Sequence, residues 1–313
     1  MIANMKNVVK RYGDHTALDH LNLNVIEGET LGLLGPNGAG KTTAIRTLCG
    51  LINADAGDIE VFGKKQSIKN LEIRRHLGLV TQEITVFNDL SAIENLRYFG
   101  GLYGLSKTEL ERNVDEMLAF VGLTDRAKKR PKTFSGGMQR RLNIACALVH
   151  KPKLVIMDEP TVGIDPQSRN HILESVKKIA QQGTTVIYTS HYMEEVQALC
   201  NRISIMDAGR VIADGSIEEL MGRIQYEERI HLHAAAPSQA LLQELQAVSG
   251  VKHVSVVGSQ YTIVSGASSG NVNRIMEVAH RNGGVSSFSE EKPNLEDVFL
   301  TLTGKRLRDD GEV

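Results

Sequence analysis

A glycine-rich segment near the N-terminus has the residue types and spacing of a phosphate-binding loop. It matches the pattern G-x-x-x-x-G-K-[ST] and consists of Gly35, Pro36, Asn37, Gly38, Ala39, Gly40, Lys41, Thr42 and Thr43. Glycines let backbone N–H groups converge on phosphate oxygens, and the start of a following helix adds a favourable field. We expect Lys41 to bridge the β- and γ-phosphates of a nucleotide and Thr42 to offer its hydroxyl to Mg²⁺.

Two acids stand at the end of a later apolar run. Asp158 and Glu159 directly follow residues 154–157. In parallel sheets, ligands bind outside the carboxyl ends of the strands, so an acid at that position lies beside the phosphate loop. We therefore expect Asp158 to hold Mg²⁺ and Glu159 to polarise a water aimed at the γ-phosphate. Without the phosphate loop, the same two acids would be interpreted as solvated loop residues.

A serine–glycine corner and a histidine each allow two interpretations. Ser135, Gly136 and Gly137 precede a helix, where they either bring backbone N–H groups to an anion or simply cap the helix. His191 follows an apolar strand and acts either as a structural hydrogen-bonding group or as a catalytic one. Neither feature decides the chemistry alone.

An aromatic residue and an amide residue are weaker candidates. Tyr12 offers a stacking face for an adenine ring, or it is a packed surface tyrosine. Gln82 follows the short apolar run at 77–81 and is, by itself, an ordinary polar loop residue.

The elements that position these residues follow an α/β pattern. Continuous apolar runs at 30–34, 154–157 and 185–189 suit parallel strands covered on both faces, and helical periods lie between them. The stretch from about 86 to 150 indicates a helical subdomain inserted in the sheet. This pattern predicts a first domain over residues 1–222.

The remainder, residues 223–313, predicts a small α+β accessory domain, with the joint near 220–228. The expected order is β-α-β-β-α-β, which is typical of a ferredoxin-like domain, followed by a closing helix at 294–303. The expected ranges are 229–234, 237–248, 251–257, 260–265, 271–282 and 285–289.

Composition excludes several classes of protein. Lys and Arg number 36 and Asp and Glu 37, so the 313-residue chain lacks the bulk basic charge of a nucleic-acid-binding protein. The short basic run at 128–132 favours a solvated loop over a contact with nucleic acid or lipid. Three scattered cysteines form no disulfide framework, which fits a reducing compartment. No apolar run reaches the roughly 18 residues of a membrane span, and no signal peptide or lipidation site is visible. We therefore expect any membrane role to come through a partner.

Taken together and in this order, the motifs resemble those of the ATP-binding cassette (ABC) ATPases over about residues 5–215. The resemblance implies a P-loop NTPase cassette that binds ATP and Mg²⁺. It makes Tyr12 the adenine-stacking residue and Gln82 a contact to Mg²⁺ and water that also senses a membrane partner. It makes Glu159 the catalytic base and His191 the switch residue at the γ-phosphate.

The resemblance also implies a head-to-tail dimer with two ATP molecules between the subunits. Residues 135–137 resemble the signature loop, which binds the γ-phosphate held on the opposing subunit, and Asp165 ends the loop that joins the two sites. The sequence departs from the usual Leu-Ser-Gly-Gly-Gln at Phe134, which we expect still to pack, and at Met138, which removes a polar side chain that in the family contacts the ribose. Gly163 stands where alanine is commoner. Neither change removes a backbone donor, so we expect activity and a homodimer with two complete sites.

The ending at 293–304 is similar to that of drug-resistance-type ABC export ATPases, which pair with a separate membrane subunit. This resemblance implies export of a drug, antibiotic or lipid by a chain bound to the inner face of the plasma membrane. The accessory domain stabilises the dimer, regulates it, or is a packing extension. The alternatives are a soluble ABC ATPase acting on ribosomes or DNA, an importer subunit, and a nucleotide-gated module that does not hydrolyse ATP.

Overall fold

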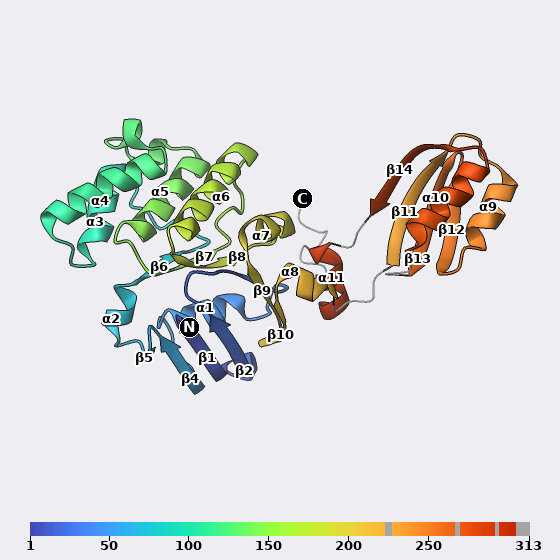
Figure 1. Cartoon of the computed structure of the whole chain (residues 1–313). Helices are drawn as coiled ribbons and strands as arrows, with labels where there is room; N and C mark the ends of the chain where they lie inside the picture. Colours follow the sequence, from blue (N-terminus) through green and yellow to red (C-terminus); the bar gives the residue numbers. More distant parts are fainter. Residues whose placement is uncertain (223–226, 267–269, 292–293, 305–313) are drawn as a thin grey trace. The chain divides into compact units, whose positions relative to one another are not determined.

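The computed structural model describes residues 1–222, 227–266, 270–291 and 294–304. Within these ranges the chain forms two compact units (Figure 1). The first comprises Met1–Ile217 together with residues 302–304, and the second comprises Glu218–Thr301. One part of the expected joint is structured. Leu220 belongs to helix α8 (Ile217–Gly222) and is fully buried. Residues 223–226 of the expected joint lie outside the described ranges.

A six-stranded sheet runs through the first unit in the order β10-β9-β3-β8-β7-β6. Its strands are β3 (Thr30–Leu34), β6 (Leu77–Val80), β7 (Leu154–Asp158), β8 (Thr185–Thr189), β9 (Arg202–Asp207) and β10 (Arg210–Gly215). Every residue of β3, β7 and β8 is buried, as continuous apolar runs predict. Neighbouring strands are parallel except β10, which pairs antiparallel with β9. The carboxyl ends of the parallel strands therefore meet at one edge.

A second, antiparallel sheet is built from strands that lie before and after β3 in the sequence, and it was not predicted. It has the order β2-β1-β4-β5. Its strands are β1 (Ala3–Tyr12), β2 (His15–Val25), β4 (Ala56–Val61) and β5 (Lys64–Lys65). These strands are half-buried, so their apolar residues alternate instead of forming runs, as Leu21, Leu23 and Val25 do. Register shifts between β1 and β2 interrupt that alternation further.

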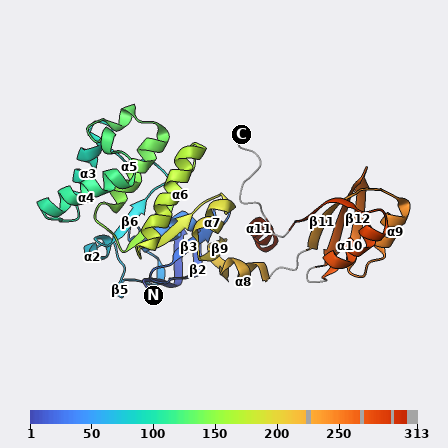
Figure 2. The same cartoon turned by 45° about the horizontal axis from the view of Figure 1, so that its top comes forward.

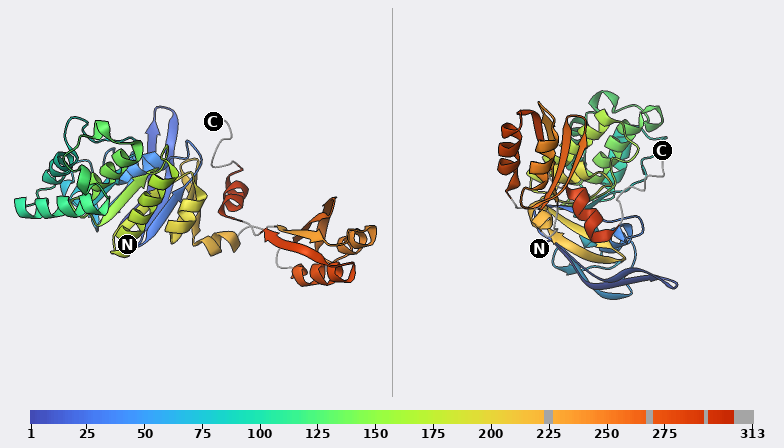
Figure 3. Two further views of the ribbon diagram at one scale, coloured as in Figure 1. Left: turned by 90° about the horizontal axis from the view of Figure 1, so that it is seen from above. Right: turned by 90° about the vertical axis from the view of Figure 1, so that its right-hand side faces the viewer.

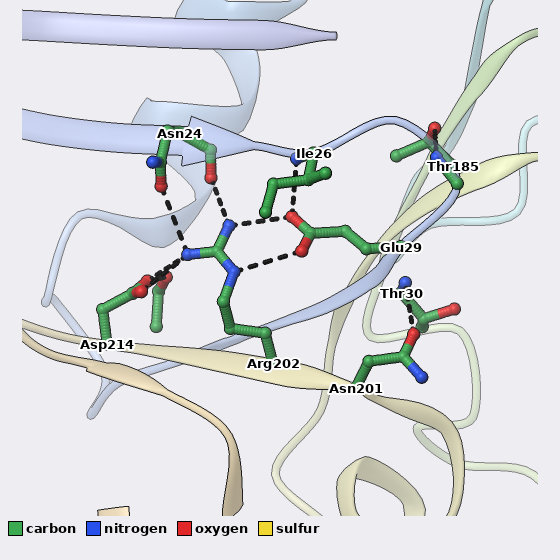
Figure 4. A network of polar contacts seen from close by, with 10 residues as sticks. Asn24, Ile26, Glu29, Thr30, Thr185, Asn201, Arg202 and Asp214 are labelled. Carbon is green, nitrogen blue, oxygen red and sulfur yellow. Dashed lines mark hydrogen bonds and ion pairs between the residues drawn. The ribbon is translucent and has the colours of Figure 1, made fainter. Parts of the chain in front are cut away.

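Arg202 joins the two sheets through a partly buried network of polar contacts (Figure 4). Its guanidinium binds both oxygens of Glu29, at 2.8 and 3.1 Å, and lies 2.6 Å from the Asp214 carboxylate on β10. It also donates at 2.7 Å to the backbone oxygen of Asn24, on β2. The paired, bidentate geometry fixes the end of β2 against β9 and β10.

Helices cover the central sheet and build the helical insertion. Helix α1 (Lys41–Leu48) follows β3, and α6 (Pro166–Gln181) and α7 (Met193–Leu199) follow β7 and β8. The insertion comprises α3 (Ala92–Gly101), α4 (Lys107–Phe120) and α5 (Gly136–Leu148), which gather at one end of the unit (Figure 2). They share a core that includes Leu96, Val114 and Leu142. The short helices α2 (Leu71–Arg74), η1 (Thr124–Arg126) and η2 (Pro131–Thr133) complete the unit.

The second unit has the expected ferredoxin-like order. Its antiparallel sheet, β12-β13-β11-β14, is built from β11 (Glu227–Ala234), β12 (Val251–Val257), β13 (Gln260–Gly266) and β14 (Val285–Glu291). Helices α9 (Gln239–Gln246) and α10 (Asn271–Arg281) pack on one face of it (Figure 3). Leu232 lies opposite both Tyr261 and Phe288 in the register, so these apolar side chains share that face. The expected closing helix is α11 (Leu295–Thr303).

Across the parts of the chain that the structure describes, no helix combines the length and apolar character that crossing a bilayer requires. Architecture and strand order together confirm the predicted fold class: a mixed-sheet α/β unit with a helical insertion, and a small α+β unit after it.

Candidate active site

The phosphate loop lies between β3 and α1, at the carboxyl edge of the central sheet. Gly40, directly before α1, has a φ of 97°, and a Cβ placed there would lie 2.5 Å from the backbone oxygen of Ala17. Only glycine fits this turn without strain. Lys41 is 8% exposed, and its Nζ donates to the backbone oxygens of Gly35 at 2.6 Å and Pro36 at 3.2 Å. Burial lowers the pKa of Lys41, so the ammonium would gain from a nearby anion.

Asp158 and Glu159 leave β7 beside this loop and are held by Thr189 at the end of β8. The Thr189 hydroxyl donates to Oδ1 of Asp158 at 2.8 Å and accepts the backbone N–H of Glu159 at 2.9 Å. These contacts follow from the strand register, because Asp158 on β7 is paired with Thr189 on β8. Glu159 has a φ of 50°, a left-handed conformation that turns its side chain away from the strand direction.

Thr42 and Asp158 present two oxygen ligands side by side. The Thr42 hydroxyl lies 3.4 Å from Oδ2 of Asp158. Burial raises the pKa of Asp158, an effect opposed by the hydrogen bond from Thr189. A hydroxyl and a desolvated carboxylate beside a buried lysine fit Mg²⁺ bound together with phosphate oxygens. In the described ranges, no group of three or more His, Cys, Asp and Glu is arranged to hold a metal alone.

His191 contacts Glu159 directly. Its Nε2 lies 2.5 Å from Oε1 of Glu159, and both side chains are less than one-fifth exposed. The hydrogen bond to His191 lowers the pKa of Glu159, against the opposing effect of burial. The carboxylate is therefore ionised at neutral pH. The structure brings together five of the predicted site residues: Lys41, Thr42, Asp158, Glu159 and His191.

Gln82 lies at the same edge of the sheet but on an exposed loop. It follows β6, and the pairing of Val80 with Met157 places the ends of β6 and β7 next to each other. Its backbone oxygen accepts from Arg140, whose guanidinium also donates to the backbone oxygen of Thr81 at 2.7 Å. Arg140 belongs to α5 and is 4% exposed, so it ties the loop of Gln82 to the helix that begins at the serine–glycine corner.

The serine–glycine corner forms a second group, with Asp165. Ser135 caps α5 by accepting the Met138 N–H at 3.3 Å, as the sequence predicts, and Asp165 caps α6 by accepting the Ser168 N–H at 2.9 Å. Gly137 brings the two helix starts together, because a Cβ there would lie 2.4 Å from the Cβ of Ser168. The hydrogen bond from the Ser168 backbone lowers the pKa of Asp165. None of the described contacts of this group reaches Lys41, Asp158 or Glu159 of the same chain.

Tyr12 ends β1 and is 49% exposed, so its ring is open for stacking. The Nζ of Lys10 lies 5.6 Å from its ring centroid and forms a 3.0 Å ion pair with Asp55. Asp55 also accepts the Arg11 N–H at 2.6 Å. The strand end that carries Tyr12 is thereby fixed, while the ring itself has no described contact with the phosphate-loop residues.

Sequence reasoning missed Thr189 and Arg140. Thr189 is an ordinary β-branched residue at the end of an apolar run, and no local pattern marks it as a partner of the two acids. Arg140 lies within an Arg-Arg pair just after the glycines, and arginine side chains are mostly exposed in folded proteins. Its position within a helix that packs on the sheet was a signal that one of the two arginines must be buried.

Two family models match the chain. Residues 18–162 match a model described as ABC transporter, and residues 215–303 match a model for the C-terminal domain of DrrA1-3-like ATP-binding proteins. The first match includes the phosphate loop and the acid pair, and the second includes the whole ferredoxin-like sheet.

Curated relatives match over nearly their full length. The chain is 45% identical to the linearmycin resistance ATP-binding protein LnrL of Bacillus subtilis, covering 97% of this chain and 99% of the relative. It is 38% identical to a Nod factor export ATP-binding protein I of Cupriavidus metallidurans, with 98% and 99% covered. It is also 38% identical to the daunorubicin resistance ATP-binding protein DrrA3 of Streptomyces coeruleorubidus, with 96% and 95% covered.

Solved structures match the first unit. An ATP-binding subunit of an ABC transporter superposes with a TM-score of 0.66 at 29% identity, covering 71% of this chain and 93% of that one. A dimeric cassette in a post-hydrolysis state with ADP and phosphate gives a TM-score of 0.62 at 28% identity, with 68% and 98% covered. This chain therefore belongs to the ATP-binding proteins of ABC transporters, whose activity is the hydrolysis of ATP.

Proposed function

We propose that ATP hydrolysis by this chain drives the export of a small molecule through a separate membrane subunit. The observation that carries the ATPase chemistry is the meeting of Lys41, Thr42, Asp158, Glu159 and His191 at one sheet edge. Export is supported by relatives named for antibiotic resistance or export that match over both units. Because those names refer to different compounds, the proposal specifies small-molecule export and no single compound.

The proposed chemistry divides among the residues of this edge. Lys41 and the backbone N–H groups of the phosphate loop, other than Pro36, bind the phosphates, and Tyr12 stacks on the adenine ring. Thr42, Asp158 and Gln82 would hold Mg²⁺. The nucleotide supplies the phosphoanhydride bond that is cleaved, and bound Mg²⁺ would neutralise the charge that develops on its phosphates. Glu159 is ionised, and its left-handed backbone conformation turns its side chain away from the strand direction. Its carboxylate orients and polarises the attacking water. His191 holds that carboxylate and faces the γ-phosphate.

We propose that two copies of the chain bind head to tail and complete each other's sites. Ser135 and Gly137 lie at the start of α5 together with Asp165, apart from the phosphate loop of their own chain. Backbone N–H groups at such a corner bind a phosphate held by an opposing subunit. A solved relative that is dimeric with ADP and phosphate supports this arrangement. Met138 changes one side chain at the corner but leaves the backbone donors in place.

A pocket of about 180 Å³ supports the docking of a membrane subunit on the first unit. It is lined by the end of α1, by β6, by the helical insertion and by Thr85 of the loop that carries Gln82. The Thr85 hydroxyl and N–H both donate to Asn143 on α5, at 2.9 and 3.2 Å. A membrane subunit seated here would contact the loop of Gln82 directly. This docking would place the chain on the inner face of the plasma membrane.

The test uses the full chain reconstituted in liposomes together with the proposed membrane subunit. Wild type is expected to release phosphate when Mg²⁺ is present. Glu159→Gln is expected to bind ATP, to elute as a dimer with ATP and to release no phosphate. The proposal fails if the reconstituted wild type releases no phosphate. The soluble-ATPase alternative gains support if wild type is fully active and the membrane protein neither binds it nor changes its rate.

A further inference from the structure

Glu195 is a buried carboxylate that the ATPase chemistry described above does not use. It lies on α7 and is 3% exposed. One oxygen, Oε2, accepts three hydroxyl donors: Ser190 at 2.6 Å, Tyr188 at 2.8 Å and Thr161 at 2.9 Å. A buried carboxylate costs stability unless donors and a counter-charge compensate it. Glu195 and the three hydroxyl groups that donate to it form one hydrogen-bonded cluster, which we call the Glu195 hub.

The other oxygen of Glu195 faces a cation from a different helix. Nε of Arg169, on α6, lies 3.3 Å from Oε1 of Glu195. The same guanidinium lies 3.7 Å above the ring of Tyr192. Arg169 is one helical turn after Asp165 and donates its backbone N–H to the Asp165 backbone oxygen at 2.9 Å. The hub therefore reaches the start of α6, where Asp165 lies.

The hub also fixes the segment that carries His191. Ser190 directly precedes His191, and its hydroxyl donates to Glu195 while accepting the N–H of Tyr192 at 2.9 Å. Tyr192, directly after His191, lies against Arg169. On the preceding residue, Thr189 binds Asp158 and Glu159. The residues before and after His191 are therefore both fixed by contacts, and the His191 imidazole lies against Glu159.

We infer that Glu195 is a positioning residue, which holds the turn of His191 against Glu159 and joins that turn to the start of α6. The inference rests on the proposed roles of Glu159 and His191 in hydrolysis. Beyond those roles, one buried carboxylate, that of Glu195, fixes the position of His191 relative to the loop that ends at Asp165. Without the carboxylate, Ser190 and Arg169 lose their common partner, and the imidazole is free to leave its contact with Glu159.

Glu195→Gln tests the inference, because the substitution keeps the shape but removes the charge and one acceptor. The matched control is Glu194→Gln, the same substitution on the neighbouring, exposed residue of α7. In the full chain with its membrane partner, Glu195→Gln is expected to lower kcat by roughly 10- to 100-fold, as a small misplacement of catalytic groups does. The KM for ATP is expected to stay within about twofold of wild type. Glu194→Gln is expected to match wild type in both.

A double-mutant cycle with His191→Ala separates positioning from loss of structure. If Glu195 acts through His191, Glu195→Gln adds little to the kcat loss of His191→Ala. A full additional loss in that background, or an unchanged kcat in the single variant, overturns the inference. If Glu195→Gln does not fold, Ser190→Ala removes the link to the turn while keeping the Arg169–Glu195 pair. It is expected to give the same non-additive loss, and a wild-type kcat for Ser190→Ala also overturns the inference. If His191→Ala equals wild type, the proposed role of His191 fails instead.

Discussion

Replacing Thr189 by valine should destabilise the first unit in proportion to the hydrogen bonds that its hydroxyl makes with Asp158 and Glu159. Valine keeps the shape of threonine, so no cavity forms, but it can neither donate to Asp158 nor accept from Glu159. Thr189 is fully buried, so water does not replace either partner. A bond to a charged group contributes roughly 1.5–3 kcal/mol, and a buried N–H left unpaired costs about 1–3 kcal/mol. Since such contributions overlap, we expect the free energy of unfolding to fall by about 2–4 kcal/mol.

The assay is urea unfolding followed by far-ultraviolet circular dichroism, since the chain has no tryptophan. The transition of the first unit is identified as the one that ATP shifts to higher urea. Thr185→Val is the matched comparison, because Thr185 is fully buried on the same strand and accepts one neutral bond, from the Gly28 N–H at 2.8 Å. It should cost about 1 kcal/mol. If Thr189→Val costs no more than Thr185→Val, the reasoning about the acid pair is refuted.

Three further outcomes follow from the site. Gly40→Ala should raise the Kd for ATP at least about tenfold by calorimetry, because the added Cβ meets the Ala17 backbone oxygen at a positive φ; wild-type affinity would contradict this. Gly137→Ala should abolish ATP-dependent dimerisation in light scattering, because its Cβ meets the side chain of Ser168, and Ser168→Gly should restore it; failure of that rescue would show that the clash is not the cause. Burial raises the pKa of Asp158, so its ionisation reduces the stability of the nucleotide-free protein as the pH rises above the carboxyl's ordinary pKa of about 3.9. Asp158→Asn should therefore raise the Tm without nucleotide at pH 7, with a smaller gain at pH 5 and loss of Mg²⁺-dependent hydrolysis; an unchanged Tm at pH 7 would contradict the sign.

Much of the fold could be predicted from the sequence, because the core strands are uninterrupted apolar runs. Residues 30–34 and 185–189 were predicted as buried parallel strands and are β3 and β8. The second unit was readable for a different reason, since its short strands and helices are separated by turn residues such as Gly258. The antiparallel sheet of the first unit, β2-β1-β4-β5, was not predicted, because β1 and β2 mix polar and apolar residues and their pairing shifts register.

The candidate site was also predicted unevenly. The phosphate loop and the acid pair were found because each motif lies within a few consecutive residues, at the end of a recognisable strand. Thr189, Arg140 and Glu195 were not, because each acts through partners that lie elsewhere in the chain. The Arg140 contact to the Thr81 backbone, for example, requires α5 to pack against the end of β6.

The sequence by itself determined which chemical groups the protein has and at which strand ends they stand. Local patterns encode this, because a glycine turn, a buried strand and a helix cap each depend on neighbouring residues. Only the tertiary structure decided which groups meet: that Thr189 holds both acids, that His191 reaches Glu159, and that Glu195 gathers three hydroxyls and an arginine. These contacts join strands and helices remote in the sequence, and their geometry follows from strand register and packing, which no local pattern records.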